Sequence, residues 1–167
     1  MTYYLSAERN RDLVGSYQRY QQYLRENEKQ FPRLAFELAT SEWYQNAKDH
    51  RCPHDSWLEN LVISELPDSG RKRNTSVRIR LLAAYHDGYI EFFYPRVFTY
   101  SFESSACFEG LGDWLYDEFR LSAGGNLIHE IEWSGREADK GSRWIIESSD
   151  VQFQWIPSPI SAAPLTS

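Results

Sequence analysis

The sequence predicts an α+β domain, in which an N-terminal helical hairpin packs on a mainly antiparallel, curved sheet of about seven to eight strands. Apolar residues recur at helical spacing within residues 1–46, whereas in residues 54–156 they alternate as in strands and are interrupted by turn residues. We expect a meander that forms a half-barrel or a sandwich, and one domain over residues 1–156. Residues 157–167 carry three prolines among small residues and are expected to be a flexible tail.

The composition limits both the partner and the compartment. At 167 residues with 16% aromatic residues, the chain has enough apolar area for a packed core. A net charge of −6 argues against nucleic-acid binding and favours a basic partner. No stretch approaches eighteen apolar residues, the first residues lack a signal-like apolar run, and the two cysteines lack CxxC spacing. These features predict a cytoplasmic protein that does not span a membrane.

Two amphipathic helices are expected at the start of the chain. Ser6 is a candidate cap for the first helix, and the Phe31–Pro32 step ends that helix and opens the second over residues 32–45. The apolar positions of the first helix are Leu13, Tyr17, Tyr20 and Leu24. We expect this stripe to pack against the sheet rather than to bind a ligand.

Asp87–Gly88 is typical of a two-residue hairpin turn between two runs of strand-forming residues. That turn would place His86 opposite Tyr89 and Leu81 opposite Tyr94. One face of this hairpin would then be apolar throughout and would belong to the core. Its residues are Ile79, Leu81, Ala83, Tyr85, Ile90, Phe92 and Tyr94.

A second hairpin is expected to join residues 114–121 to residues 126–133. A three-residue loop with Ser122 opposite Asn126 gives the better segregation of apolar side chains, so this register is preferred. A last hairpin is expected between residues 143–148 and 151–156, with Trp144 opposite Trp155.

In the preferred register, Asp117 and His129 fall as diagonal neighbours on the apolar face of the second hairpin. A carboxylate that orients an imidazole is a legitimate catalytic candidate. The alternative interpretation, a buried polar pair that satisfies its own hydrogen bonds, is the more common one because no third catalytic group is in view. A small hydrolase or a ligand-binding barrel that uses His129 and Asp117 is therefore the second functional hypothesis.

The opposite face of the same hairpin carries aromatic residues between carboxylates. Glu118 should lie directly opposite Glu130, with only Arg120 nearby to relieve the repulsion. A solvated acidic face is the ordinary explanation, but aromatic anchors among carboxylates also suit a cationic protein partner. The predicted partner-binding residues are Trp114, Tyr116, Glu118, Glu130 and Glu132.

No metal, cofactor or standard catalytic motif is predicted. His54–Asp55, His86–Asp87 and His129–Glu130 pair a histidine with an acid, but adjacent residues of a strand point to opposite faces and do not ligate one ion together. The sequence contains no GxSxG, Walker loop, HExxH or GxGxxG pattern. The chain is therefore predicted not to be an enzyme.

Four phrases of the sequence resemble the small acidic immunity proteins of bacterial polymorphic toxin systems. They are HDSWLENLVISE, LLAAYHDGYIEFFYPRV, GDWLYDEFRLS and NLIHEIEWSG. The resemblance covers about residues 53–156 and leaves the helical hairpin outside it. It implies a cytoplasmic antitoxin-like protein that binds one toxin domain and blocks its active site, with no catalysis of its own.

Overall fold

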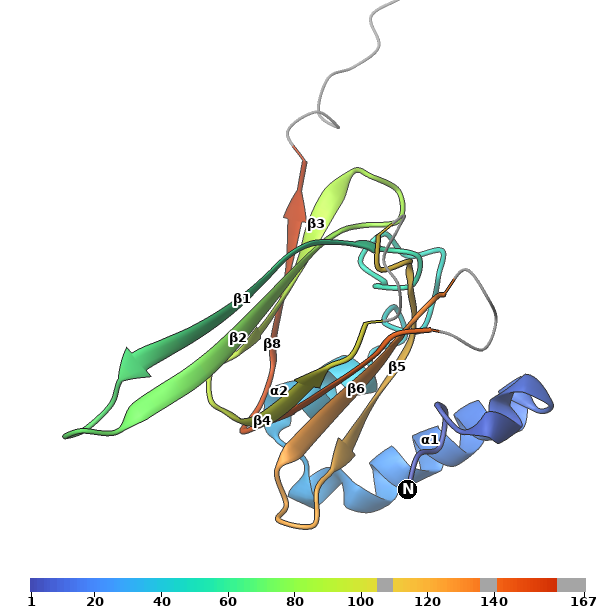
Figure 1. Ribbon diagram of the computed structural model, residues 1–167. Helices are drawn as coiled ribbons and strands as arrows, with labels where there is room; N and C mark the ends of the chain where they lie inside the picture. Colours follow the sequence, from blue (N-terminus) through green and yellow to red (C-terminus); the bar gives the residue numbers. More distant parts are fainter. Residues whose placement is uncertain (105–109, 136–140, 159–167) are drawn as a thin grey trace, which may run out of the picture.

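The computed structural model describes residues 1–104, 110–135 and 141–158 of the chain. The predicted α+β class is confirmed: two N-terminal helices accompany eight antiparallel strands in the described part of the chain. The strands form two four-stranded sheets, with orders β1-β2-β3-β8 and β4-β7-β6-β5 (Figure 1). The strands are β1 (Trp57–Pro67), β2 (Arg73–Leu82), β3 (Gly88–Tyr94), β4 (Val97–Phe102), β5 (Trp114–Leu121), β6 (Leu127–Trp133), β7 (Arg143–Ser148) and β8 (Gln152–Pro157).

The β2–β3 hairpin has a longer loop than the sequence predicted. Leu81 pairs with Ile90 rather than with Tyr94, so the prediction of a two-residue turn at Asp87–Gly88 is wrong. The loop covers residues 83–87, and the Ala83 N–H donates to the Gly88 carbonyl. Because the register differs by four residues, an even number, the side chains keep their faces. Six of the seven predicted core residues are buried, and only Tyr85, which lies in the loop, is exposed.

The β5–β6 hairpin has the predicted register, with Phe119 opposite His129 and the Ser122 N–H bonded to the Asn126 carbonyl. The predicted hairpin between the last two strands is wrong. Strand β7 pairs with β4 and β6, whereas β8 joins the other sheet beside β3. Between them the Asp150 carboxylate accepts hydrogen bonds from two backbone N–H groups at the start of the second helix. This contact holds the chain where it passes from one sheet to the other.

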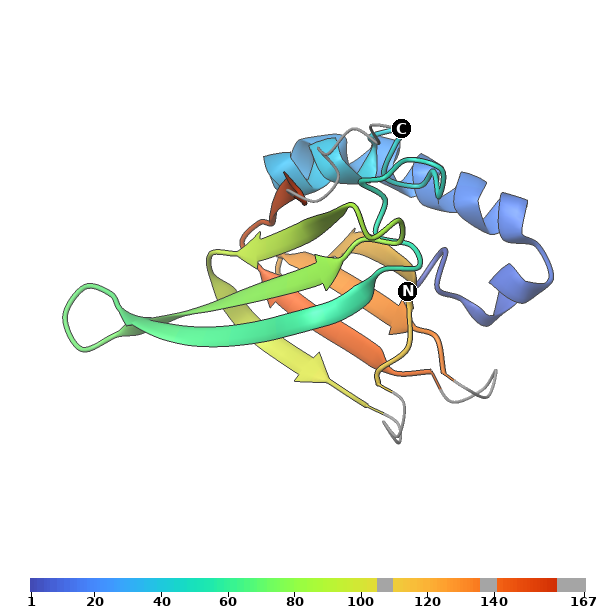
Figure 2. The ribbon, with the colours of Figure 1, turned by 90° about the horizontal axis from the view of Figure 1, so that it is seen from above.

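The helices α1 (Leu13–Asn27) and α2 (Arg33–Ala39) lie along one side of the two sheets (Figure 2). Asp12, not Ser6, caps α1, because its carboxylate accepts the Gly15 N–H at 2.8 Å. Helix α2 ends at Ala39, six residues before the predicted end. Strand β5 is the sheet edge next to α1, and the Tyr20 and Tyr23 hydroxyls accept two of its backbone N–H groups. The helix therefore closes an edge that would otherwise expose hydrogen-bonding groups.

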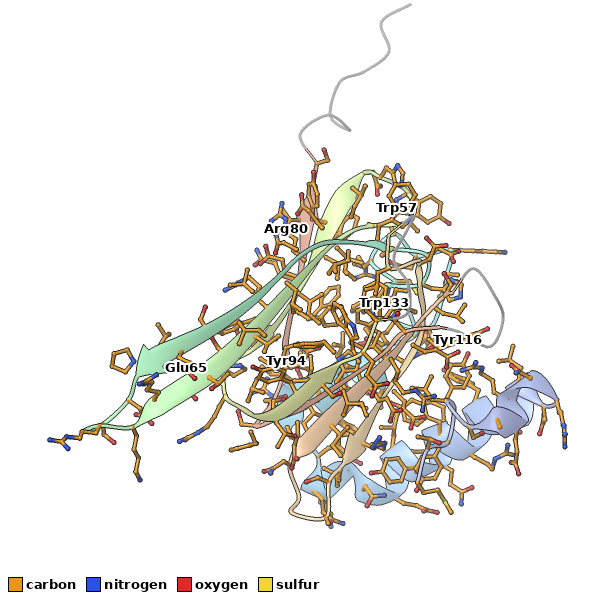
Figure 3. All side chains as sticks on the ribbon, in the orientation of Figure 1. Trp57, Glu65, Arg80, Tyr94, Tyr116 and Trp133 are labelled. Atoms are coloured by element: carbon orange, nitrogen blue, oxygen red, sulfur yellow. The ribbon has the colours of Figure 1, made fainter. Side chains whose placement is uncertain are left out.

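One hydrophobic cluster fills the space between the sheets and extends to the helices. Phe92 of β3 stacks on Trp114 of β5, with ring centroids 5.2 Å apart and an interplanar angle of 9°. Tyr94 and Trp133 also point into this space (Figure 3). The predicted flexible tail falls almost entirely on residues 159–167, which lie outside the described residues, as does Cys107.

Candidate functional site

The structure brings Asp117 and His129 together in the core. The His129 Nε2 atom lies 2.9 Å from the Asp117 Oδ2 atom, which also accepts the Tyr44 hydroxyl at 2.7 Å. The other carboxylate oxygen accepts the Trp114 indole N–H at 3.0 Å. The Tyr94 hydroxyl lies 2.6 Å from the remaining ring nitrogen of His129. These five side chains form one buried polar network, in which the Asp117 carboxylate is within hydrogen-bond distance of Tyr44, Trp114 and His129.

The hydrogen bonds assign the histidine tautomer. The Tyr94 hydroxyl has no other partner among the described residues, so it donates to Nδ1 of His129, and the Nε2–H group donates to Asp117. In this arrangement each of the two ring nitrogens of His129 has one hydrogen-bond partner. Burial raises the pKa of the Tyr44 and Tyr94 hydroxyls well above the ordinary value, which keeps both as donors at neutral pH.

Both members of this pair are buried among the described residues. The His129 side chain is fully buried, with the Phe119 ring stacked on it at 4.0 Å between centroids. Asp117 borders one small cavity of about 50 Å³, whose walls include Tyr44, Cys52 and His54. That volume admits a water molecule or two but no larger ligand. Burial also raises the pKa of the Cys52 thiol to about 11, which leaves it protonated and a poor nucleophile.

The predicted acidic face of β5 and β6 forms in register but is not a free surface. Glu118 lies opposite Glu130 as expected, and Tyr116 lies opposite Glu132. A bulge between Trp114 and Tyr116 shifts the strand by one residue, so Trp114 turns into the core. The predicted exposure of Trp114, Glu118 and Glu130 is therefore wrong, since all three are buried.

The N-terminal segment covers Glu118. Its carboxylate accepts three consecutive backbone N–H groups, from Tyr3, Tyr4 and Leu5, at distances of 2.8–3.4 Å. Burial raises the pKa of Glu118, while these three N–H groups oppose the shift. The N-terminal residues thus occupy the place on this face that a partner was expected to take.

Arginines neutralise the rest of the face. Arg9 binds Glu132 with two hydrogen bonds of 2.9 and 3.0 Å and lies over the Tyr116 ring. Arg120 pairs with Glu130, and Arg143 contacts the same carboxylate at 3.1 Å. We call this set the Glu–Arg ladder. Its members are Glu118, Glu130, Glu132, Arg9, Arg120 and Arg143.

The histidines outside the core lie near acids but do not form a metal site. His54 lies 3.0 Å from Asp55, and His50 contacts Asp87. Within residues 1–104, 110–135 and 141–158, no group of three or more His, Cys, Asp or Glu side chains could hold a metal ion. No helix in this part of the chain is long and apolar enough to cross a membrane.

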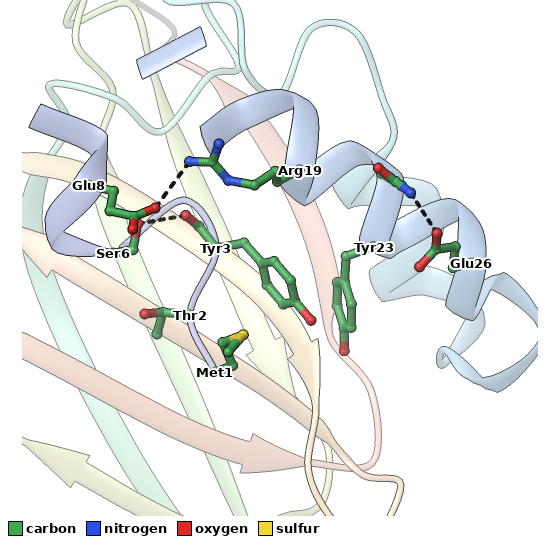
Figure 4. A pocket seen from close by; sticks show the side chains of 9 residues that line it. Met1, Thr2, Tyr3, Ser6, Glu8, Arg19, Tyr23 and Glu26 are labelled. Carbon is green, nitrogen blue, oxygen red and sulfur yellow. Dashed lines mark hydrogen bonds and ion pairs between the residues drawn. The ribbon is translucent and has the colours of Figure 1, made fainter. Parts of the chain in front are cut away.

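A groove of about 440 Å³ lies between the N-terminal segment and α1 (Figure 4). Tyr3 and Tyr23 stack at one side of it with ring centroids 4.4 Å apart. Arg19 lies 3.5 Å from Glu8 across it. Four of the side chains that line the groove therefore already contact one another in pairs.

The exposed apolar residues of β1 were missed by the sequence analysis. The outer parts of β1 and β2, residues 62–78, project from the body, and beyond the Val77–Tyr94 pair they continue as a two-stranded ribbon (Figures 1 and 2). We call residues 62–78 the arm. Val62, Ile63 and Leu66 are each about half exposed there, and Glu65 marks its outer part in Figure 3. In the sequence these residues are spaced as in an ordinary buried strand. Only the structure shows that their side chains are exposed.

Comparison with known proteins does not assign the chain to a family. No family model, no curated protein and no solved structure matches this chain. The immunity-protein resemblance therefore stays a prediction from the four sequence phrases.

Proposed function

We propose that this chain is a non-catalytic protein-binding module that contacts its partner through the arm and the free edge of β1. The observation that carries the proposal is the arm itself. The outer part of the arm is a two-stranded ribbon, which is marginally stable in water, and the arm as a whole exposes large apolar side chains on both faces of β1. Clustered apolar exposure of this kind marks interaction sites rather than ordinary surface.

The position of β1 supports the same conclusion. It is the outer strand of its sheet, so among the described residues one of its edges has no neighbouring strand beyond the single bridge between Trp57 and Asp113. Proteins usually protect such edges with short strands, bulges or charges, because a free edge accepts strands from other chains. Strand β1 has a bulge near Leu58 but then runs regularly to Pro67. A partner segment could pair along this stretch and cover its apolar side chains.

The finer proposal concerns the identity of the partner. The sequence resemblance suggests an immunity protein in the cytoplasm, with a cognate toxin domain as the partner. The net charge of −6 favours a basic partner, because complementary charge speeds association. The buried His129–Asp117 network supports the non-catalytic interpretation, since its hydrogen bonds are satisfied within the core.

The test is an affinity capture from lysate of the native host with tagged variants of the whole chain. Val62 and Leu66 share one face of β1, and the double substitution Val62→Ser and Leu66→Ser removes its apolar surface. Val14→Ser is the matched control, because Val14 is 67% exposed on α1, away from the arm. We expect one near-stoichiometric partner that the control retains and the double variant loses.

Two results would contradict the proposal. Retention of the partner by the double variant would exclude the arm as the contact surface. Failure to capture any protein, at low salt and with the toxin candidates of the host expressed, would exclude the binding module. Far-ultraviolet circular dichroism of the three proteins verifies that the fold is unchanged.

A further inference from the structure

The arm carries a charge opposite in sign to that of the rest of the chain. Residues 62–78 contain four basic and two acidic side chains, which give a net charge of +2, whereas the whole chain has a net charge of −6. The chain outside the arm therefore has a net charge of −8. Net charge acts on the approach of a partner at long range, but the groups at the contact decide what is bound there. The local charge of the arm therefore selects the group that the arm contacts.

Both acidic side chains of the arm already have a partner. The Glu65 carboxylate accepts a hydrogen bond from the Arg73 guanidinium at 2.7 Å. The Asp68 carboxylate lies 3.6 Å from the guanidinium of Arg96, in the turn between β3 and β4. Neither carboxylate is therefore left to neutralise a further cation of the arm.

Two cations at the tip of the arm have no such partner. Arg78, at the base of the arm, pairs with Glu91 of β3. Arg71 and Lys72 are exposed, and neither side chain has a hydrogen bond or an ion pair within the described part of the chain. The Lys72 carbonyl accepts the Asp68 N–H at 2.9 Å, but the Asp68 side chain is the one that contacts the turn. Two positive charges therefore remain uncompensated at the tip.

The strand register places one of these cations beside the exposed apolar side chains. Leu66 lies opposite Asn74, and the bond from the Asp68 N–H to the Lys72 carbonyl extends this pairing toward the tip. Side chains alternate along each strand, so Lys72 belongs to the face that carries Val62 and Leu66. Those two side chains are 46% and 56% exposed. An apolar surface that ends in a free cation is thus left for a partner to cover.

The free edge of β1 sets the direction of a partner segment. Strand β1 runs toward the tip of the arm and ends at Pro67, and every strand pair of its sheet is antiparallel (Figure 1). A segment that continues the sheet in the same way runs from the tip toward the body, and antiparallel pairing is slightly more stable per residue than parallel pairing. Its first residues then lie near Arg71 and Lys72, and its later residues lie along Val62 and Leu66.

We propose that the arm binds an extended acidic segment of a protein partner, in which carboxylates precede alternating apolar residues. The carboxylates pair with Arg71 and Lys72, the apolar side chains cover Val62 and Leu66, and the backbone pairs antiparallel to β1. The inference rests on the proposed protein-binding function and names the chemistry that the arm selects. In a partner that is basic overall, this acidic segment is a local feature.

A protein segment fits the arm better than the other common polyanions do. The net charge of −8 outside the arm repels a nucleic-acid backbone and an anionic bilayer alike. A phosphate backbone or a lipid headgroup also offers no strand to the unpaired N–H and C=O groups of the β1 edge. A peptide backbone satisfies those groups while its side chains meet the arm.

The test uses three synthetic peptides as defined probes. Acetyl-EEVTVTV-amide has the proposed order, acetyl-QQVTVTV-amide lacks the charges, and acetyl-VTVTVEE-amide has the same residues with the acids last. Binding is followed by NMR on the whole 15N-labelled protein at low salt, through the assigned backbone amide signals of β1. Vesicles of phosphatidylserine and phosphatidylcholine, and a single-stranded oligonucleotide, are titrated in the same way.

We expect saturable shifts of the β1 amides with acetyl-EEVTVTV-amide and weaker binding of the other two peptides. The double variant Arg71→Gln and Lys72→Gln should weaken binding of acetyl-EEVTVTV-amide by roughly three- to tenfold, since two exposed ion pairs are lost. The same variant should bind the glutamine peptide unchanged. Arg11→Gln with Lys48→Gln is the matched control, because it removes the same two charges from exposed side chains outside the arm. This control should change the affinity by less than about twofold.

Equal affinities for the acidic and neutral peptides, or equal losses in the two double variants, would overturn the inference. Equal affinity for the peptide with the acids last would also overturn it, because antiparallel pairing distinguishes the two orders. So would β1 amides that do not shift up to about 10 mM acetyl-EEVTVTV-amide, or binding of the vesicles or the oligonucleotide in its place.

The capture experiment separates this inference from the proposed function. The variant with serine substitutions at Val62 and Leu66 tests the arm as the contact surface, whereas the glutamine substitutions at Arg71 and Lys72 test only its charge. If the serine variant loses the captured partner while the glutamine variant retains it at full affinity, the proposed function stands and only this inference fails.

Discussion

Replacement of Asp117 tests whether the buried network is structural. In Asp117→Asn, the amide offers one oxygen where the carboxylate offered two, so one of the donors Tyr44, Trp114 and His129 must face an N–H group. An unpaired buried donor costs about 1–3 kcal/mol, and the two remaining bonds weaken because the acceptor is no longer charged. Relief of the buried charge offsets part of this loss. We expect the free energy of unfolding to fall by about 2–3 kcal/mol.

The measurement is urea denaturation followed by tryptophan fluorescence, with thermal unfolding alongside. For a chain of this length, a loss of that size lowers Tm by roughly 4–12 °C. Tyr44→Phe removes one donor to the same carboxylate, so a double-mutant cycle with Asp117→Asn should give a coupling energy of about 1–2 kcal/mol. Asp12→Asn is the control and should change stability by less than about 0.5 kcal/mol. A change at Asp117 no larger than in this control would refute the network.

Three further predictions concern stability. Burial raises the Glu118 pKa, so its contribution to stability is fully present below the ordinary value of 4.5 and declines as pH rises through the raised value. Glu118→Gln should remove this decline from urea midpoints measured between pH 4 and 8, and parallel curves would contradict it. Tyr20→Phe leaves a β5 amide unpaired and should cost about 1–3 kcal/mol; unchanged hydrogen exchange at that amide would argue against the contact. Gly112→Ala places a Cβ 1.8 Å from the Ser134 carbonyl oxygen, whereas Gly70 also has a positive φ, 73° against 94° at Gly112, but no atom lies within 4 Å of the added Cβ. Gly112→Ala should therefore lower Tm more, and equal Tm values would exclude the close approach.

The core of the β2–β3 hairpin was predictable even though its turn was not. An error of four residues in register leaves every side chain on its own face, because the strand period is two. The positive φ of His86 allows the longer loop, and nothing in the residue type signals it. A one-residue bulge had the larger consequence. It reversed the orientation of Trp114, which the sequence analysis had placed on the surface.

The pairing of the last two strands could not be predicted from their alternation. Trp144 and Trp155 both face apolar surroundings, as a hairpin would require, but they do so from different sheets. Two strands joined by a short connection pair in most proteins. Here the Asp150 carboxylate binds the N-terminal end of α2 instead, which is a contact over 115 residues of sequence. Local pattern carries no information about a partner that distant.

The Glu–Arg ladder changes how the net charge should be interpreted. The carboxylates of Glu118 and Glu130 are adjacent as predicted. Glu130 pairs with Arg120 and Arg143, but the N–H groups that bind Glu118 come from residues more than 110 positions away, as does the Arg9 guanidinium that binds Glu132. An acidic face in a single strand pair is therefore no indication of an acidic surface. Charge reversal at Glu118 or Glu130 would bury an unpaired cation and unfold the protein rather than report on a partner. A test of binding must therefore use side chains whose removal leaves no buried charge, and Val62 and Leu66, which are about half exposed on the arm, meet this condition.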